Sequence, residues 1–177
     1  MKRGVVIPLL FVLAVCAGAE MNSTTPESAV LNTWNAVLNG SPQEFLATLE
    51  NGCASQIMQE CSEYLHLMQT MSYAELGMTF AKLRLEAAPG EIEYWDNTAV
   101  LEMILSAPEQ AYILEKSFLL IDSLQSGDNT GIVFITLDIS GIGNTLLEIP
   151  VVSTTAGWQV TGIDPIVSSV LESIFTQ

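Results

Sequence analysis

The sequence predicts an α+β domain in which N-terminal helices pack on a curled antiparallel sheet, with a further helix at the C-terminus. Two observations support this prediction. The first half of the chain has apolar residues at helical spacing between capping signals, and the second half has short strand-like runs between turn residues. A block of helices followed by hairpin-connected strands is typical of the α+β class.

Capping signals divide the first half into four predicted helices. Thr25-Pro26 and Ser41-Pro42 each place a side-chain cap before a first-turn proline, and Ser72 to Glu75 forms a capping box. Asn39-Gly40 and Asn51-Gly52 are interpreted as helix stops. The helices are therefore expected near residues 26–38, 42–50, 57–68 and 73–81.

The second half changes to strand-like runs separated by turn residues. The turn-forming segments are Asp96-Asn97, Ser126 to Asn129, Ser140 to Asn144 and Thr154 to Gly157. The strands that they separate are expected at residues 92–95, 98–105, 112–121, 132–139, 146–152 and 158–163. Short hairpin connections of this kind predict an antiparallel sheet.

A last helix is predicted after Asp164-Pro165, which supplies a cap and a first-turn proline. Serines and Glu172 occupy one side of this segment. The apolar residues recur along the other side, and they are Ile166, Val167, Val170, Leu171, Ile174 and Phe175. We expect this stripe to be buried on the domain's own sheet or groove, with a second copy or a partner protein as the alternatives.

Residues 1–19 have the pattern of a secretory signal peptide. Lys2-Arg3 gives a positive start, an apolar run follows, and small residues end at Ala19. The run is shorter than the ~20 residues needed to cross a bilayer. We expect cleavage after Ala19; the alternative is lipidation at Cys16, because Leu13 to Cys16 resembles a lipobox with an atypical residue before the cysteine. The protein is then periplasmic, extracellular or lipid-anchored at the cell envelope.

Length and charge limit the number of domains and the classes of partner. Removing residues 1–19 from the 177-residue chain leaves 158 residues, which is the size of one domain. We expect residues 20–25 to be a short linker and residues 26–177 to be the folded domain. The formal net charge of −15 becomes −17 without the two cations of the leader. Only Lys82, Arg84 and Lys116 then remain as strong cations. This is too few to bind nucleic acid or anionic headgroups, so contact with a membrane is expected only through a lipid on Cys16.

Cys53 and Cys61 are the two cysteines beyond the leader. On one continuous helix they would be about 12 Å apart, beyond the ~7 Å limit between Cα atoms for a disulfide. A bend after Asn51-Gly52 would permit a disulfide, so this question stays open. Two cysteines at this spacing with His66 nearby match no standard metal site, and we predict neither a metal nor a cofactor.

The order of the elements resembles a known family. Residues 26–49 are similar to the opening helical pair of the nuclear transport factor two-like (cystatin-like) superfamily, and residues 149–160, with Gly157-Trp158 at the start of a strand, resemble its closing hairpin. Small exported or lipid-anchored bacterial members of unassigned function are especially similar. The resemblance implies a cone-shaped domain whose sheet wraps around a pocket, a scaffold used by enzymes and by binding modules.

The carboxylates and the single histidine are the candidates for chemistry. Catalytic members of the superfamily set an aspartate, histidine or tyrosine against an apolar wall. Glu102 and Asp138 are the corresponding candidates for a general base, if their strands turn them inward. His66 is expected on the polar side of its helix, in solvent. Since no Tyr-Asp or His-Asp pairing matches the family's active-site patterns, the enzymatic function is not carried over.

A set of large apolar side chains is the candidate for binding. They lie in different predicted elements and could line a pocket for a small apolar molecule or a segment of an envelope protein, or simply form the core. The candidate binding residues are Trp34, Met68, Trp95, Phe118 and Phe134. We therefore expect an exported, non-enzymatic binding or interaction module, with a small-molecule enzyme of the isomerase and cyclase type as the alternative and an accessory subunit as a third class.

Overall fold

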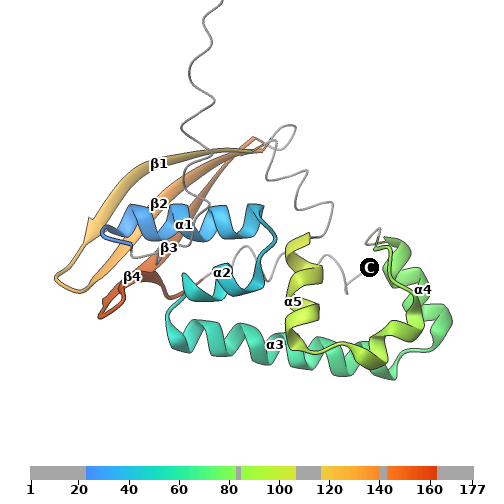
Figure 1. The fold of residues 1–177 in the computed structure, drawn as a ribbon. Coiled ribbons are helices and arrows are strands. Elements are labelled where there is room, and N and C mark those ends of the chain that lie inside the picture. The colour runs from blue at the N-terminus through green and yellow to red at the C-terminus, as the bar shows by residue number, and fades with distance from the viewer. Residues whose placement is uncertain (1–22, 83–84, 107–116, 140–142, 163–177) are drawn as a thin grey trace, which may run out of the picture.

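The computed structural model describes residues 23–82, 85–106, 117–139 and 143–162 (Figure 1). Its elements are α1 (Pro26–Leu38), α2 (Pro42–Ala47), α3 (Asn51–Thr70), α4 (Tyr73–Lys82), the 3-10 helix η1 (Pro89–Tyr94), α5 (Asn97–Ser106), β1 (Ser117–Ser126), β2 (Thr130–Ile139), β3 (Gly143–Thr154) and β4 (Gly157–Val160). The α+β class and the antiparallel sheet are therefore confirmed. The predicted leader over 1–19 and the predicted C-terminal helix lie outside the described residues.

Helix α1 begins as its capping signal predicts. The Thr25 hydroxyl accepts a hydrogen bond from the Ser28 amide at 3.2 Å, and the Ser28 hydroxyl accepts one from the Thr25 amide at 3.0 Å. Pro26 occupies the first turn, where its missing amide costs no helical hydrogen bond. One side of the helix, which includes Ala29 and Val30, is buried. The helix lies across the sheet (Figure 1).

The two strands predicted over residues 92–105 are helical instead. Asp96 acts as a cap, because its Oδ1 accepts a hydrogen bond from the Ala99 amide at 2.8 Å, and α5 follows. The residues before it form η1 behind Pro89. The prediction was wrong because a short apolar run without alternation is compatible with either a strand or a buried helix. Here Val100, Leu101 and Ile104 are buried together only in the helix.

Helix α3 begins earlier than predicted, and it therefore includes both Cys53 and Cys61. Asn51-Gly52 does not end a helix; it opens α3, and the Glu50 carboxylate caps it by accepting from the Gly52 amide at 2.7 Å. Cys53 and Cys61 therefore lie on one continuous helix. Eight residues at 1.5 Å rise separate them by about 12 Å, too far for a disulfide between them.

In the part of the chain that the structure describes, four strands form one antiparallel sheet in the order β1-β2-β3-β4, and this sheet is not closed into a barrel. The register of β1 against β2 shifts between Ile121 and Ser123, which marks a β-bulge. At the other edge, Val160 of β4 forms a parallel bridge with Leu49. This bridge joins the sheet to the segment between α2 and α3.

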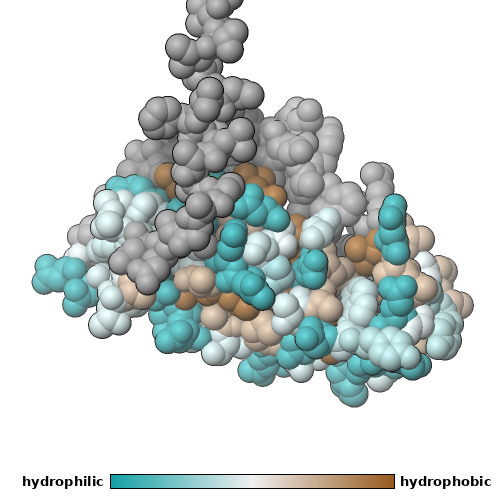
Figure 2. Space-filling view, in the orientation of Figure 1, coloured by the Kyte–Doolittle hydropathy of each residue, from teal (hydrophilic) through white to brown (hydrophobic). Residues whose placement is uncertain are grey.

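The end of the molecule away from the sheet is helical. Figure 1 shows α3 extending below α2 and α5 towards α4. Met68 of α3, Phe80 of α4 and Ile104 of α5 are buried there. The lower edge of the face in Figure 2, over α3, is mostly hydrophilic. Among the described residues, no helix combines the length and apolar character that crossing a membrane requires.

Candidate binding groove on the outer face of the sheet

Alternation along β2 and β3 gives the sheet two different faces. The inner face, under α1, is buried and consists of Val133, Ile135, Ile149 and Val151, with Val160 of β4. The residues between them point to the opposite side, which we call the outer face, because successive side chains of a strand alternate. The outer face of β2 and β3 comprises Thr130, Ile132, Phe134, Thr136, Leu146, Glu148, Pro150 and Val152.

A hollow of about 450 Å³ lies beside the β1–β2 turn and has part of the outer face as its wall. We call it the groove. Its lining residues come from the turn, from β2 and β3, and from the residue after β4. They are Gly127, Thr130, Gly131, Ile132, Pro150, Val151, Val152 and Thr161.

Backbone hydrogen bonds hold the rim of the groove. The Gly127 amide donates to the Thr130 carbonyl at 2.6 Å and closes the β1–β2 turn. The Ser153 amide donates to the Asn129 carbonyl at 2.9 Å. Opposite this turn, the Thr161 amide donates to the carbonyl of Pro150 at 2.9 Å, so the chain beyond β4 continues along β3. The walls are therefore parts of the sheet itself.

The lining combines apolar surface with a few polar groups. Ile132 and Val152 are half-buried and Pro150 is exposed, so apolar surface remains available in the groove. Thr130 and Thr161 are exposed and each carries a hydroxyl that can donate and accept a hydrogen bond. Of the lining residues that the structure describes, none is an acid or a base. This composition suits the binding of an apolar group oriented by hydroxyl contacts.

The predicted binding residues with described side chains lie in different parts of the fold. Trp34 lies half-buried on α1, and Met68 is fully buried in α3. Trp95 stacks on Phe80 beyond η1. Phe134 lies half-buried on the outer face, and Phe118 is described only by its backbone, which pairs with Asp138. Met68 and Trp95 therefore belong to the helical end, and among the candidates whose side chains the structure describes, Phe134 alone lies on the same face as the groove.

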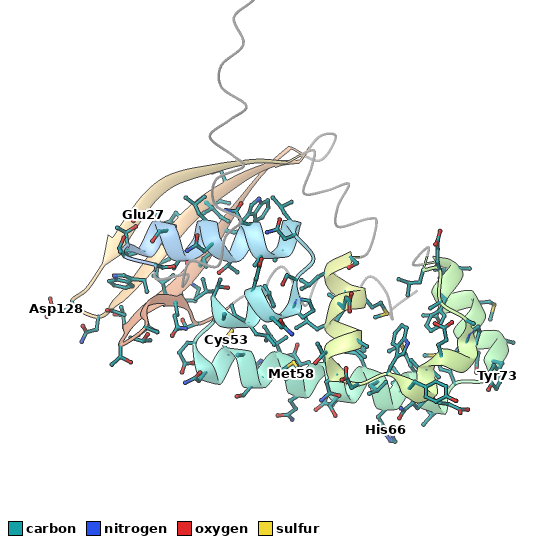
Figure 3. All side chains as sticks on the ribbon, in the orientation of Figure 1. Glu27, Cys53, Met58, His66, Tyr73 and Asp128 are labelled. Atoms are coloured by element: carbon teal, nitrogen blue, oxygen red, sulfur yellow. The ribbon has the colours of Figure 1, made fainter. Side chains whose placement is uncertain are left out.

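The structure describes the side chains of Glu102 and His66, but only the backbone of Asp138. Glu102 is exposed on α5 between the buried Leu101 and Met103, so the strand geometry that would have turned it inward is absent. Asp138 lies in β2 opposite Asn144 of β3, and only its backbone is described. His66 is exposed, as predicted, and Figure 3 shows it projecting from α3 away from α5.

The thiol of Cys61 is chemically inert in this setting. Burial and, to a smaller extent, the neighbouring Glu60 carboxylate together raise its pKa from 9.0 to about 11. Since the thiolate is the reactive form of cysteine, the buried group is a poor nucleophile and metal ligand. In the part of the chain that the structure describes, no group of three or more histidine, cysteine, aspartate and glutamate residues could hold a metal ion.

The groove residues were not singled out from the sequence, although a signal for them exists. That signal is Pro150, which interrupts an apolar strand; in β2 the four residues from Ile132 to Ile135 are all apolar, so polarity does not distinguish the two faces of that strand. Alternation shows that a strand has two faces, but it does not show which face a helix covers. That assignment depends on α1 and its packing.

Comparison of the chain with models of protein families, with curated proteins and with solved structures found no significant match.

Proposed function

We propose that this protein is an exported, non-enzymatic binding module of the cell envelope that holds an apolar group in the groove on the outer face of its sheet. The observation that carries the proposal is the lining of the groove. Ile132, Pro150 and Val152 offer apolar surface, and Thr130 and Thr161 offer hydroxyls. Such a lining binds and orients a ligand without supplying an acid or a base.

The scaffold that we propose is a member of the nuclear transport factor two-like superfamily. Two features support this: helices precede the strands, and α1 lies across one face of an antiparallel meander. In the cone-shaped members the pocket lies on the inner face of the curled sheet. Here the inner-face residues Val133, Ile135 and Val151 are packed under α1, which is why we place the ligand on the outer face.

The cellular setting in this proposal comes from the leader over residues 1–19. Export places the domain in the envelope or outside the cell, and a lipid on Cys16 would hold it at a membrane. The ligand is then a small apolar molecule or an apolar segment of an envelope protein. The acidic character of the chain, with a net charge of −15, keeps such an apolar-binding protein soluble.

The proposal can be tested with a neutral fluorescent probe, N-phenylnaphthylamine, titrated against the full mature chain. We expect saturable binding that Ile132→Asp weakens by about tenfold or more, since an apolar side chain contributes ~1.5 kcal/mol on burial. Leu31→Asp is the matched control, because Leu31 is an exposed leucine on α1. Equal probe binding by the wild type and by Ile132→Asp would refute the assignment of the groove.

A further inference from the structure

We propose that the ligand of the groove is a small amphipathic cation, an apolar molecule that carries an alkylated ammonium group at one end. Its apolar part lies in the groove, and its charged end lies between Phe134 and Glu148 on the outer face. This inference rests on the proposed function, because it names the class of ligand that the same groove takes. It is supported by the position of this residue pair, its chemistry, the charge around it and the size of the groove.

Phe134 and Glu148 lie next to the groove on the same face of the sheet. Ile132 of β2 pairs with Pro150 of β3, and both residues line the groove. The next outer-face pair along these two strands is Phe134 with Glu148. Successive pairs on one face are about 7 Å apart, because every second residue of a strand points to that face. A ligand that fills the groove therefore reaches Glu148 by extending over one further pair.

The two side chains of this pair are complementary to an organic cation. Residues directly opposite each other in antiparallel strands have Cβ atoms about 4.5–5.5 Å apart, so one ligand group can contact both side chains. The face of an aromatic ring attracts an ammonium group, and quaternary ammonium ligands are recognised in this way. The carboxylate adds the opposite charge. Glu148 is exposed and Phe134 is half-buried, so both are accessible to a ligand.

The charge around the pair favours a cation over an anion. The full chain has a formal net charge of −15. Lys82 is the one lysine or arginine among the residues that the structure describes, and it lies in α4, at the end of the molecule away from the sheet (Figure 1). Beside the groove, Asp128 is exposed in the β1–β2 turn (Figure 3). The field of the protein therefore attracts a cationic ligand and repels an anionic one.

The size and the walls of the groove favour a small molecule over a peptide. Its volume of about 450 Å³ lies in the range of small-molecule sites. A peptide that adds a strand to a sheet needs an unpaired strand edge. At the groove, β3 pairs with β2 on one side, and on the other side it pairs with β4 and with the Thr161 amide, which donates to the Pro150 carbonyl. The backbone of β3 is therefore already paired there.

The experiment measures how well three octyl compounds displace N-phenylnaphthylamine from the full mature chain. The compounds are octyltrimethylammonium, 1-octanol and octyl sulfate, which share a chain and differ in the charge of the head group. Each is kept below its solubility limit and below any concentration at which it forms micelles. We expect the ammonium compound to bind about fivefold more tightly than the alcohol, since an exposed cation–π contact and an exposed ion pair each contribute modestly. The sulfate should bind more weakly than the alcohol.

Two substitutions test the pair, and the readout is the ratio of the affinities for the ammonium compound and the alcohol. Glu148→Gln removes the charge at an exposed position and should lower this ratio about threefold. Phe134→Leu keeps an apolar side chain but removes the aromatic face, and it should lower the ratio by a similar factor. Glu102→Gln is the matched control, because it removes the same charge from an exposed position on α5, and it should leave the ratio unchanged.

The outcomes separate this inference from the proposed function. If binding of N-phenylnaphthylamine depends on Ile132 but the three compounds displace it equally, the groove stands and the cationic ligand is refuted. A preference that Glu102→Gln lowers as much as Glu148→Gln would arise from the net charge of the whole protein, which also refutes the inference. A preference that depends on Asp128 and not on Glu148 would place the charged end at the β1–β2 turn and overturn the assignment to the pair. If no probe binding depends on Ile132, the proposed function fails, and this inference fails with it.

Discussion

The ring of Phe80 stacks on the indole of Trp95, with ring centroids 5.5 Å apart and planes inclined by 13°. Phe80 belongs to α4, and Trp95 follows directly after η1. The stack therefore joins α4 to the residue that ends η1. It also explains Trp95, a predicted pocket residue, as part of the core of the helical end.

Removal of this stack should destabilise the helical end strongly. Phe80 is buried, and replacing a buried phenylalanine by alanine costs roughly 3–5 kcal/mol. We expect Phe80→Ala to lower the free energy of unfolding by that amount in urea titrations. Tyr94→Ala is the matched control, because Tyr94 precedes Trp95 but is 86% exposed, and its effect should stay within about 0.5 kcal/mol.

The cap of α4 should make stability depend on pH in the acidic range. The Ser72 hydroxyl and amide both donate to Oε2 of Glu75, at 2.7 and 2.8 Å, and these hydrogen bonds lower the pKa of Glu75 below its ordinary value of 4.5. The contribution is therefore complete above pH 4.5 and is lost as the pH falls through the lowered pKa.

Thermal unfolding of Glu75→Gln across this range checks the expectation. The wild type should be more stable than Glu75→Gln at neutral pH, and the difference should shrink as the pH falls below 4.5. Glu93→Gln removes the same charge from an exposed position on η1 and serves as the control for net charge. A difference that grows towards acidic pH would contradict the hydrogen-bonded cap.

Cys61 should resist alkylation in the folded protein. Its pKa of about 11, against 9.0 for an ordinary thiol, lowers the thiolate fraction near pH 8 on the order of 100-fold. Burial adds a steric barrier. We expect iodoacetamide at pH 8 to modify Cys61 rapidly only after urea is added, with mass spectrometry of peptides as the measurement. Rapid labelling of Cys61 in the native protein would show that this part of α3 opens.

His66 should be dispensable for both fold and function. Its side chain is exposed on α3, and substitutions at such positions usually change stability by less than about 0.5 kcal/mol. We expect His66→Ala to unfold at the same urea concentration as the wild type and to bind N-phenylnaphthylamine equally. A large loss of probe binding would instead place His66 in a site.

The processing of the leader can be measured directly. We expect the mature chain to begin at Glu20, or at a lipidated Cys16, because the apolar run ends at two overlapping signals. Either form keeps Ser23, whose carbonyl accepts a hydrogen bond from the Trp158 amide of β4 at 2.8 Å. Intact-mass analysis of protein from a secreting host decides between the two. A full-length soluble cytoplasmic form would contradict export.

The sequence alone was sufficient for features that depend on local chemistry. Helix α1 begins at Thr25-Pro26 as predicted, because a side-chain cap and a first-turn proline act within one turn of the chain. The hairpin around Ala156 was recognised from its turn residues, with Gly157 at a φ of +103° that favours glycine. The solvent exposure of His66 followed from helical periodicity in the same way.

Tertiary packing decided the features that depend on distant neighbours. Residues 98–105 form a helix and not a strand because α5 packs its apolar residues against α3, although the cap at Asp96 is a local signal that also fits a turn between strands. The same holds for the groove. Alternation in β2 and β3 defined two faces, but only the position of α1 determined that Val133 and Val151 are buried while Ile132 and Pro150 remain accessible. Local hydrogen bonding can be inferred from neighbouring residues, whereas the burial of a face depends on which distant element covers it.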